Sequence, residues 1–257
     1  MAIRRFREHA AKQNCFAVAI DVLIVFLGVF LGMQVNVWNE ARLDRAEGRA
    51  NREMLIADLR ANQTNLAMRR HYYEWVRAEA LKTSDALAGR RSSTDEQFLI
   101  DAYQSSQILP WSLKRNTYDQ IIARGTIEHV GDAVLRDRIS NYYVGADVTG
   151  ANLGSVPPYR ETLRRVMPYA VQSRVRTDCG EKIGENSRGE ADMVLPGDCH
   201  IRIDAAAIRQ AAGQVRGTPS LSLDLNRLLV DLDQKLVSVD VISRRAGVLA
   251  QALKDAS

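Results

Sequence analysis

The longest apolar run in the chain covers Phe16–Val37 and has the sequence FAVAIDVLIVFLGVFLGMQVNV. About twenty such residues in a helix span a hydrocarbon core of roughly 30 Å, at about 1.5 Å per residue. Fourteen of them are Leu, Ile, Val or Phe, which together favour insertion into a bilayer by about 6 kcal/mol. The one charged residue, Asp21, opposes insertion by at most about 3 kcal/mol. The pattern therefore predicts a transmembrane helix over residues 15–38.

The flanks of this run distinguish a permanent anchor from a cleaved signal peptide. Four basic residues precede it within residues 1–14, as they would in a signal peptide. However, the run is longer than a hydrophobic signal region of roughly 7–15 residues, and no small-x-small cleavage site follows it. We expect an uncleaved anchor, with residues 1–14 as a short basic arm suited to the anionic cytoplasmic leaflet.

Two glycines and one acid of the predicted span share a helical face. Asp21, Gly28 and Gly32 are separated by 7 and 4 residues, which places them within about 20° of one line along a helix. Such glycine spacing permits the close approach of another helix, and an acid on the same face is then shielded from lipid. We predict that this face packs against a second copy of the chain or against another membrane protein. The alternative is that the spacing arose by chance, because glycine is common in membrane helices.

The helical pattern continues beyond the span, from Trp38 to about Ala88, without a proline. This predicts a long membrane-proximal helix over residues 39–88. A seam with 3/4 spacing follows it and indicates coiled-coil-like pairing with one or two helices. The seam consists of Leu55, Leu59, Asn62, Leu66, Arg69, Tyr73, Val76, Ala80 and Leu87. Asn62 and Arg69 either set the register of this pairing or lie at positions where the seam turns away from the paired helix.

The rest of the chain contains helix-capping and helix-breaking residues and shows no alternating strand pattern, so we expect further helices there. We predict a helical midsection over residues 94–144 and a small-residue linker at 145–155. C-terminal helices follow over residues 156–257, with a kink at Pro168 and a loop at 179–199. In the midsection, Ser93 or Thr94 caps the first helix, Asn116 or Thr117 caps the second, which ends at Gly125, and Asp132 begins the third.

The last predicted helix runs from Thr218-Pro219 to about Lys254 and has a continuous apolar face. Its length is similar to that of the membrane-proximal helix, so antiparallel packing of the two would return the C-terminus toward the membrane. The predicted fold class is all-α: one transmembrane helix continues into a long helix, and a helical-bundle extramembrane domain covers residues 39–257.

The residues at the exit of the span are polar and amphipathic, and they carry a resemblance to a known family. The exit consists of Gln34, Asn36, Trp38, Asn39 and Glu40, and Trp38 suits the interfacial aromatic belt. With the acid Asp21, these residues resemble the start of a family of uncharacterised bacterial single-span membrane proteins. Those proteins have an acid at the entrance of the span, a Gln-x-Asn-x-Trp-Asn-Glu exit and a Leu-x-x-Asp-Leu element.

Two further segments are similar to that family. Asp58 and Leu59 match its Leu-x-x-Asp-Leu element, and Thr117–Tyr143 is similar to its midsection, a turn between two helices. The resemblance covers about a third of the chain and does not include the Cys179–Cys199 loop. It implies an anchored domain and carries over no catalytic residue.

Cysteines, more than charge, predict the orientation of the chain. Four basic residues lie on each side of the span, so the positive-inside rule gives no decision. Cys179 and Cys199 bracket one Gly- and charge-rich loop, as the partners of a disulfide do, and disulfides persist in oxidising compartments. Two free thiols in a cytosolic domain are the alternative. We therefore expect the bacterial inner membrane, with the N-terminus cytoplasmic and the C-terminal domain periplasmic.

The composition and motifs favour no enzyme and no nucleic-acid binder. The chain has 35 Lys and Arg against 31 Asp and Glu, with the signs interleaved rather than clustered in a basic patch. We find no paired histidines on a helix, no nucleophile elbow, no phosphate-binding glycine loop and no EF-hand spacing. A zinc site from Cys179, Cys199 and His200 is disfavoured because no CxxC spacing is present. We expect no cofactor and no metal.

The sequence leaves two non-enzymatic functions open. The first is a bitopic scaffold or accessory subunit that docks through its span and its periplasmic domain. The second is a periplasmic sensing or ligand-binding domain that acts with a separate signalling partner. In the second, the aromatic residues Trp111, Tyr118, Tyr142 and Tyr143 would line a pocket, although aromatic residues at helical spacing more often belong to a core.

Overall fold

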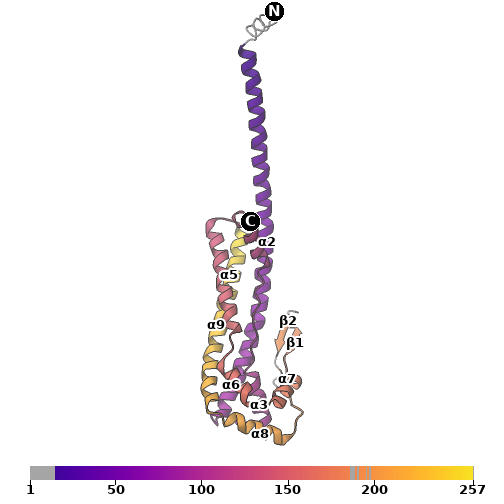
Figure 1. Ribbon diagram of the computed structural model, residues 1–257, viewed down its shortest axis with the longest axis vertical. Helices are drawn as coiled ribbons and strands as arrows, with labels where there is room; N and C mark the ends of the chain where they lie inside the picture. Colours follow the sequence, from indigo (N-terminus) through magenta and orange to yellow (C-terminus); the bar gives the residue numbers. More distant parts are fainter. Residues whose placement is uncertain (1–14, 186–188, 190, 195, 197, 257) are drawn as a thin grey trace, which may run out of the picture.

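The computed structural model describes residues 15–185, 189, 191–194, 196 and 198–256. The side chains of residues 15–19, 21, 191 and 194 also lie outside this description, and so does the predicted basic arm at 1–14. The described chain is predominantly helical, as the sequence predicts, with one long apolar N-terminal helix (Figure 1).

One helix, α2 (Cys15–Leu87), extends through the whole length of the molecule. Its 73 residues correspond to about 110 Å. Its N-terminal part projects alone, and its C-terminal part runs side by side with α5 (Ala133–Gly154) and α9 (Pro219–Asp255) (Figure 1). The predicted span and the predicted membrane-proximal helix are therefore one continuous helix.

Helices α2 and α9 form the main packing contact of the domain, and they are antiparallel. Gln63 of α2 donates to the carbonyl oxygen of Ser243, and further along α2 Arg77 pairs with Asp233. The C-terminus accordingly lies at the end of the domain from which the projecting part of α2 emerges (Figure 1). This confirms the predicted antiparallel pairing of the two long helices.

The predicted seam of α2 is the core of the domain. Its residues from Leu55 to Ala80 are all buried, and Leu87 packs against the core as a partly buried side chain. The two polar members of the seam bond to a connection outside the paired long helices. Asn62 exchanges two hydrogen bonds with the backbone of Lys114, and Arg69 donates to the carbonyl oxygen of Pro110. These side chains pair with backbone N–H and C=O groups of an extended connection that lies outside any helix or sheet.

The short helices gather at the end of the domain away from the projecting part of α2 (Figure 1). They are α3 (Asp95–Gln104), α6 (Pro158–Val166), α7 (Tyr169–Asp178) and α8 (Ala205–Arg216). The midsection also contains α4 (Asn116–Arg124) and the short 3-10 helix η1 (Thr126–His129).

Several predicted helix boundaries are confirmed by capping geometry. The hydroxyl of Thr94 accepts from the backbone nitrogen of Gln97 at the start of α3, and Asp132 caps α5 in the same way. Gly125 ends α4 with a φ of 70°, a conformation that favours glycine. The predicted cap of α4 by Asn116 or Thr117 is wrong, because the carboxylate of Asp58 in α2 approaches the backbone nitrogen of Thr117, at 3.4 Å.

The predicted linker at residues 145–155 is wrong, because α5 continues to Gly154. Gly145 lies against α9, where a Cβ atom would stand 3.1 Å from a guanidinium nitrogen of Arg245. The hydroxyl of Thr149 donates to the carbonyl oxygen of Gly145 within the same helix. The small residues that suggest a linker in sequence instead permit close helix packing.

The predicted kink at Pro168 is a complete break between α6 and α7. Met167 has ψ of 124°, as a residue that precedes proline favours. The side-chain amide of Gln172 donates to the carbonyl oxygens of Arg164 and Met167, which lie at the end of α6. The chain therefore turns without leaving these helix-end carbonyls unpaired.

The loop at 179–199 contains a two-stranded antiparallel hairpin, which the all-α prediction did not include. Strands β1 (Lys182–Glu185) and β2 (Ala191–Val194) pair with Ile183 opposite Met193. The strands have four residues each and carry Gly and charged residues, so they show no alternating pattern. Contacts with other elements, described below, hold the hairpin in place.

Candidate functional site

The apolar part of α2 has no protein partner in the described chain. The large apolar side chains from Val22 to Val37 are all exposed, at 46 to 66%. This helix is long and apolar enough to cross a membrane by length and composition. A continuous apolar surface of this extent is typical of an interaction site with lipid or protein.

The predicted packing face of this segment is open at both glycines. A Cβ atom built on Gly28 or on Gly32 would meet no atom within 4 Å. The two glycines are one helical turn apart and so lie on the same side of α2. The side chain of Asp21, the third predicted member of this face, lies outside the described residues. The face is therefore geometrically available to another helix.

The exit residues remain exposed on α2 at the end of the apolar segment. The amide of Asn36 donates to the carboxylate of Glu40 at 2.7 Å, one turn further along the helix. The indole of Trp38 is exposed, and Gln34 and Asn39 are exposed as well. None of these side chains is used by the packing of the domain.

The carboxylate of Asp58, in the segment that resembles the family's Leu-x-x-Asp-Leu element, has a structural role. It is buried, forms an ion pair with Lys114 at 3.2 Å, and faces the N-terminus of α4. A negative charge at a helix N-terminus is stabilised by the helix dipole. Asp58 thus ties α2 to α4 rather than to a ligand.

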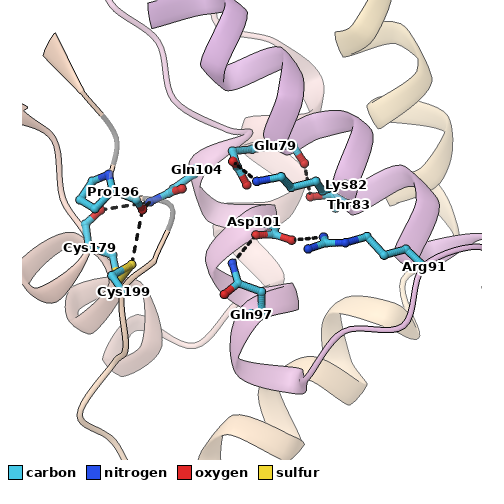
Figure 2. A network of polar contacts seen from close by, with 10 residues as sticks. All are labelled: Glu79, Lys82, Thr83, Arg91, Gln97, Asp101, Gln104, Cys179, Pro196 and Cys199. Atoms are coloured by element: carbon cyan, nitrogen blue, oxygen red, sulfur yellow. Dashed lines mark hydrogen bonds and ion pairs between the residues drawn. A yellow bond between two sulfur atoms is a disulfide. The ribbon is translucent and has the colours of Figure 1, made fainter. Parts of the chain in front are cut away.

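Cys179 and Cys199 are joined by a disulfide in the structure. The amide of Gln104 in α3 donates to the carbonyl oxygens of Cys179 and Pro196, on the two sides of this bridge (Figure 2). The disulfide and α3 together fix both ends of the segment that contains the hairpin. Reduction would release one of these two constraints.

The hairpin segment also contacts α2 through two polar side chains. The hydroxyl of Tyr72 donates to the carboxylate of Glu181, and the ring of His71 pairs with Asp192 at 3.0 Å. Burial, followed by the Glu181 contact, raises the pKa of Tyr72. The tyrosine is therefore a neutral hydrogen-bond donor, and it attaches the start of the hairpin to the central helix.

Two buried carboxylates face each other where α2 meets α3 (Figure 2). Glu79 pairs with Lys82 at 2.7 Å, and Asp101 pairs with Arg91 at 2.6 Å and accepts from Gln97. Burial is the main cause that raises the pKa of Glu79, and the nearby Asp101 adds to it. Each acid has its own cation: Glu79 pairs with Lys82 of the same helix, and Asp101 pairs with Arg91 of the connection between α2 and α3.

The aromatic residues of the midsection belong to the core. Trp111, Tyr142 and Tyr143 are buried, and the ring of Tyr118 stacks on that of Tyr143 with centroids 4.1 Å apart. Burial raises the pKa of Tyr142 to about 12. Tyr142 lines a cavity of about 760 Å³ between α5 and α9, but the other three do not.

The buried side chain of Lys235 in α9 reaches the C-terminal end of α5. The ammonium of Lys235 donates to the carbonyl oxygens of Leu153 and Ser155, at 3.2 and 3.3 Å. Burial lowers the pKa of Lys235 to about 8. Its position at a helix C-terminus, with carbonyl partners, indicates a capping role. Sequence reasoning missed this residue because a lysine within an amphipathic helix is ordinarily exposed.

Sequence reasoning also missed a cavity between α3, α6 and α7, which we call the arginine cavity. Its volume is about 590 Å³, and Arg160, Arg164 and Arg176 line it. Their spacing of four and twelve residues gave only a weak signal, because the three arginines come from two helices separated by the break at Pro168.

The described histidines do not come together. His71, His129 and His200 each face a carboxylate on a different part of the domain, and His9 lies outside the described residues. Within the described ranges, no group of three or more His, Cys, Asp and Glu side chains is arranged to hold a metal ion.

Comparison with models of known protein families, with curated proteins and with solved structures finds no match to this chain. The resemblance of the span and its exit to a family of single-span membrane proteins therefore stays a prediction. The continuity of α2, its exposed apolar segment and the disulfide are the basis for a functional proposal.

Proposed function

We propose that the protein is a single-span protein of the bacterial inner membrane that acts as a scaffold or accessory subunit. In this proposal residues 15–38 cross the bilayer, residues 1–14 are cytoplasmic and the helical domain is periplasmic. The span contacts lipid and, through Asp21, Gly28 and Gly32, a second copy of the chain or a membrane protein. The domain contacts a partner in the periplasm.

The observation that carries this proposal is the continuity of α2. One helix joins an apolar segment with exposed side chains to the buried seam of the domain, without a hinge. A rigid connection of this kind transmits the position of the span to the domain over a long distance. It suits a protein that holds a partner at a fixed height above the membrane surface.

Two further features support the topology. The exit residues, with Trp38 exposed at the end of the apolar segment, match the composition of a membrane interface. The Cys179–Cys199 disulfide is compatible with an oxidising compartment and disfavours the bacterial cytosol. Together they favour a periplasmic domain.

The docking role is tested by the variant Gly28→Ile, with Leu23→Ile on the opposite face of the helix as the matched control. The tagged protein is purified from its own membranes in mild detergent, after crosslinking, and accompanying proteins are identified by mass spectrometry. We expect Gly28→Ile to reduce recovery of the partner or of the crosslinked dimer, because a large side chain prevents close helix approach. Equal recovery with both variants would show that the glycine face does not dock.

A further inference from the structure

The arginine cavity is lined by residues of α3, α6 and α7, and these helices lie in the part of the domain away from the projecting part of α2 (Figure 1). It has a volume of about 590 Å³, within the range of roughly 300–1,000 Å³ for small-molecule sites. Its lining is mainly polar and includes Tyr103, Gln107, Arg160, Arg164, Arg176 and Glu181. This composition points to a polar ligand.

The three arginines of the cavity have neutral hydrogen-bond partners. Arg160 donates to the carbonyl oxygen of Ser106 at 2.6 Å. Arg164 and Arg176 both donate to the hydroxyl of Tyr103, at 2.9 and 3.3 Å. A carbonyl oxygen and a phenol hydroxyl are not carboxylates, so these hydrogen bonds form no ion pair with any of the three arginines.

Some other arginines of the domain are paired with carboxylates. Arg77 forms an ion pair with Asp233, and Arg115 forms one with Asp147. In the described part of the chain, no such ion pair with a carboxylate is found for Arg160, Arg164 or Arg176. The cavity therefore brings together three guanidinium groups, none of which is paired with a carboxylate of the described residues.

Arg164 shows the consequence of this crowding. Its guanidinium lies 4.0 Å above the centre of the Tyr103 ring, and its Nε is buried without a hydrogen-bond partner among the described residues. Burial is the main cause that lowers the pKa of Arg164, and the neighbouring Arg160 and Arg176 lower it further. An anion in the cavity would relieve this repulsion and add acceptors for the unused donors.

Glu181 is the one carboxylate among the described lining residues, and it already accepts a hydrogen bond from Tyr72. Three guanidinium groups against one carboxylate leave an excess of two positive charges. A phosphate monoester carries about −1.5 to −2 at pH 7 and has three terminal oxygens, whereas a carboxylate has one charge and two oxygens. Guanidinium forks match the geometry of phosphate oxygens.

We infer that the arginine cavity is a binding site for the phosphate group of a small soluble molecule, held by Arg160, Arg164 and Arg176. The cavity has room for more than the anion itself, so the remainder of the molecule lies beside Gln107 and Glu181. The disulfide holds the rim of the site, because Gly180 and Glu181 directly follow Cys179. This site is additional to the proposed scaffold role and does not depend on it.

The site is tested by isothermal titration calorimetry on the full chain in mild detergent, at constant ionic strength. Glycerol 3-phosphate, inorganic phosphate and citrate are the probes. We expect glycerol 3-phosphate to bind more tightly than the other two. Tighter or equal binding of inorganic phosphate would support the anion site but assign it to the free ion, and preference for citrate would overturn the phosphate assignment.

Arg176→Gln is the diagnostic variant, because Arg176 is exposed and its loss leaves the core intact. Arg174→Gln, an exposed arginine of the same helix outside the cavity, is the matched control with the same change in charge. We expect Arg176→Gln to weaken phosphate binding by about 10-fold, and Arg174→Gln by less than about 2-fold. Unchanged thermal unfolding of both variants verifies that each is folded.

Two further results would overturn the inference. One is the absence of binding of either phosphate probe at about 10 mM to the folded wild-type protein. The other is an equal loss of binding in both variants, which would indicate general attraction to a basic surface. Neither result bears on membrane insertion or on partner recovery, so this site and the proposed scaffold role can fail separately.

Discussion

The two parts of α2 differ in the arrangement of their apolar residues and in their surroundings. From Val22 to Val37 every large apolar side chain is exposed, whereas Leu59, Leu66 and Val76 are completely buried. In the first part apolar residues surround the helix, and in the second they form one stripe. The pattern around the helix thus indicates the partner: a stripe is covered by other helices, and a fully apolar circumference is suited to lipid.

The strongest test of this comparison is the same truncation in both parts. We expect Leu66→Ala to lower the free energy of unfolding of the domain by about 2–5 kcal/mol, because it leaves a cavity in a packed core. Leu27→Ala, in the exposed part, is the matched control and should leave the free energy of unfolding unchanged. Denaturant unfolding in detergent measures both, and equal losses would contradict the assignment of separate surroundings.

Removal of the disulfide should cause the next largest loss of stability. Cys179→Ser combined with Cys199→Ser opens a loop with a sequence separation of 20 residues, which should cost up to about 3 kcal/mol in stability. Amide hydrogen exchange should increase most between residues 182 and 194, where the hairpin depends on outside contacts. Cys15→Ser is the control, and the same increase in that variant would refute a specific role of the bridge.

Asp58 provides a smaller test of how α2 organises the midsection. Asp58→Asn removes the charge that faces the N-terminus of α4 and the ion pair with Lys114, at a cost of about 1–2 kcal/mol. Exchange of the α4 amides should accelerate more than that of α9. The exposed Asp137, which accepts from Asn141, supplies the control Asp137→Asn, for which we expect no measurable change.

Glu79→Gln should have the smallest effect on stability, and the size of this effect depends on pH. Since burial raises the pKa of Glu79 above its ordinary value of 4.5, ionisation opposes folding as the pH rises. We expect Glu79→Gln to be equal to the wild type below about pH 4.5 and to become more stable toward pH 7, by less than about 1 kcal/mol. Urea unfolding across this range measures the difference, and Glu74→Gln on the exposed face is the control. A gain at low pH that vanishes at neutral pH would contradict the assigned direction.

The features that the sequence predicted depend on residues that are close to one another in the chain. Thr94, Asp132 and Gly125 mark helix ends because capping depends on the next few residues. The seam of α2 and the apolar face of α9 repeat every three or four residues, so their pairing was also predictable.

The features that sequence did not predict depend on partners far along the chain. The roles of Asn62 and Arg69 require an extended connection about 40 to 50 residues away. Gly145 of α5 resembled part of a linker because its packing partner, Arg245, lies on α9, and the hairpin is held by contacts of Tyr72 and His71. The arginine cavity assembles Tyr103 with arginines from two later helices.

The central claim is that a membrane covers the exposed apolar part of α2 and that the domain lies on the periplasmic side. Single cysteines at Val29 and at Leu223 test it in a Cys15→Ser background, with the native disulfide retained. Both side chains are exposed in the structure, at 60 and 71%.

The measurement is labelling of intact cells with a membrane-impermeant maleimide, followed by labelling after denaturation. We predict that Leu223→Cys reacts in intact cells and that Val29→Cys reacts only after denaturation, because lipid covers it. Reaction at both positions would contradict membrane insertion, and no reaction at Leu223→Cys until lysis would contradict a periplasmic domain.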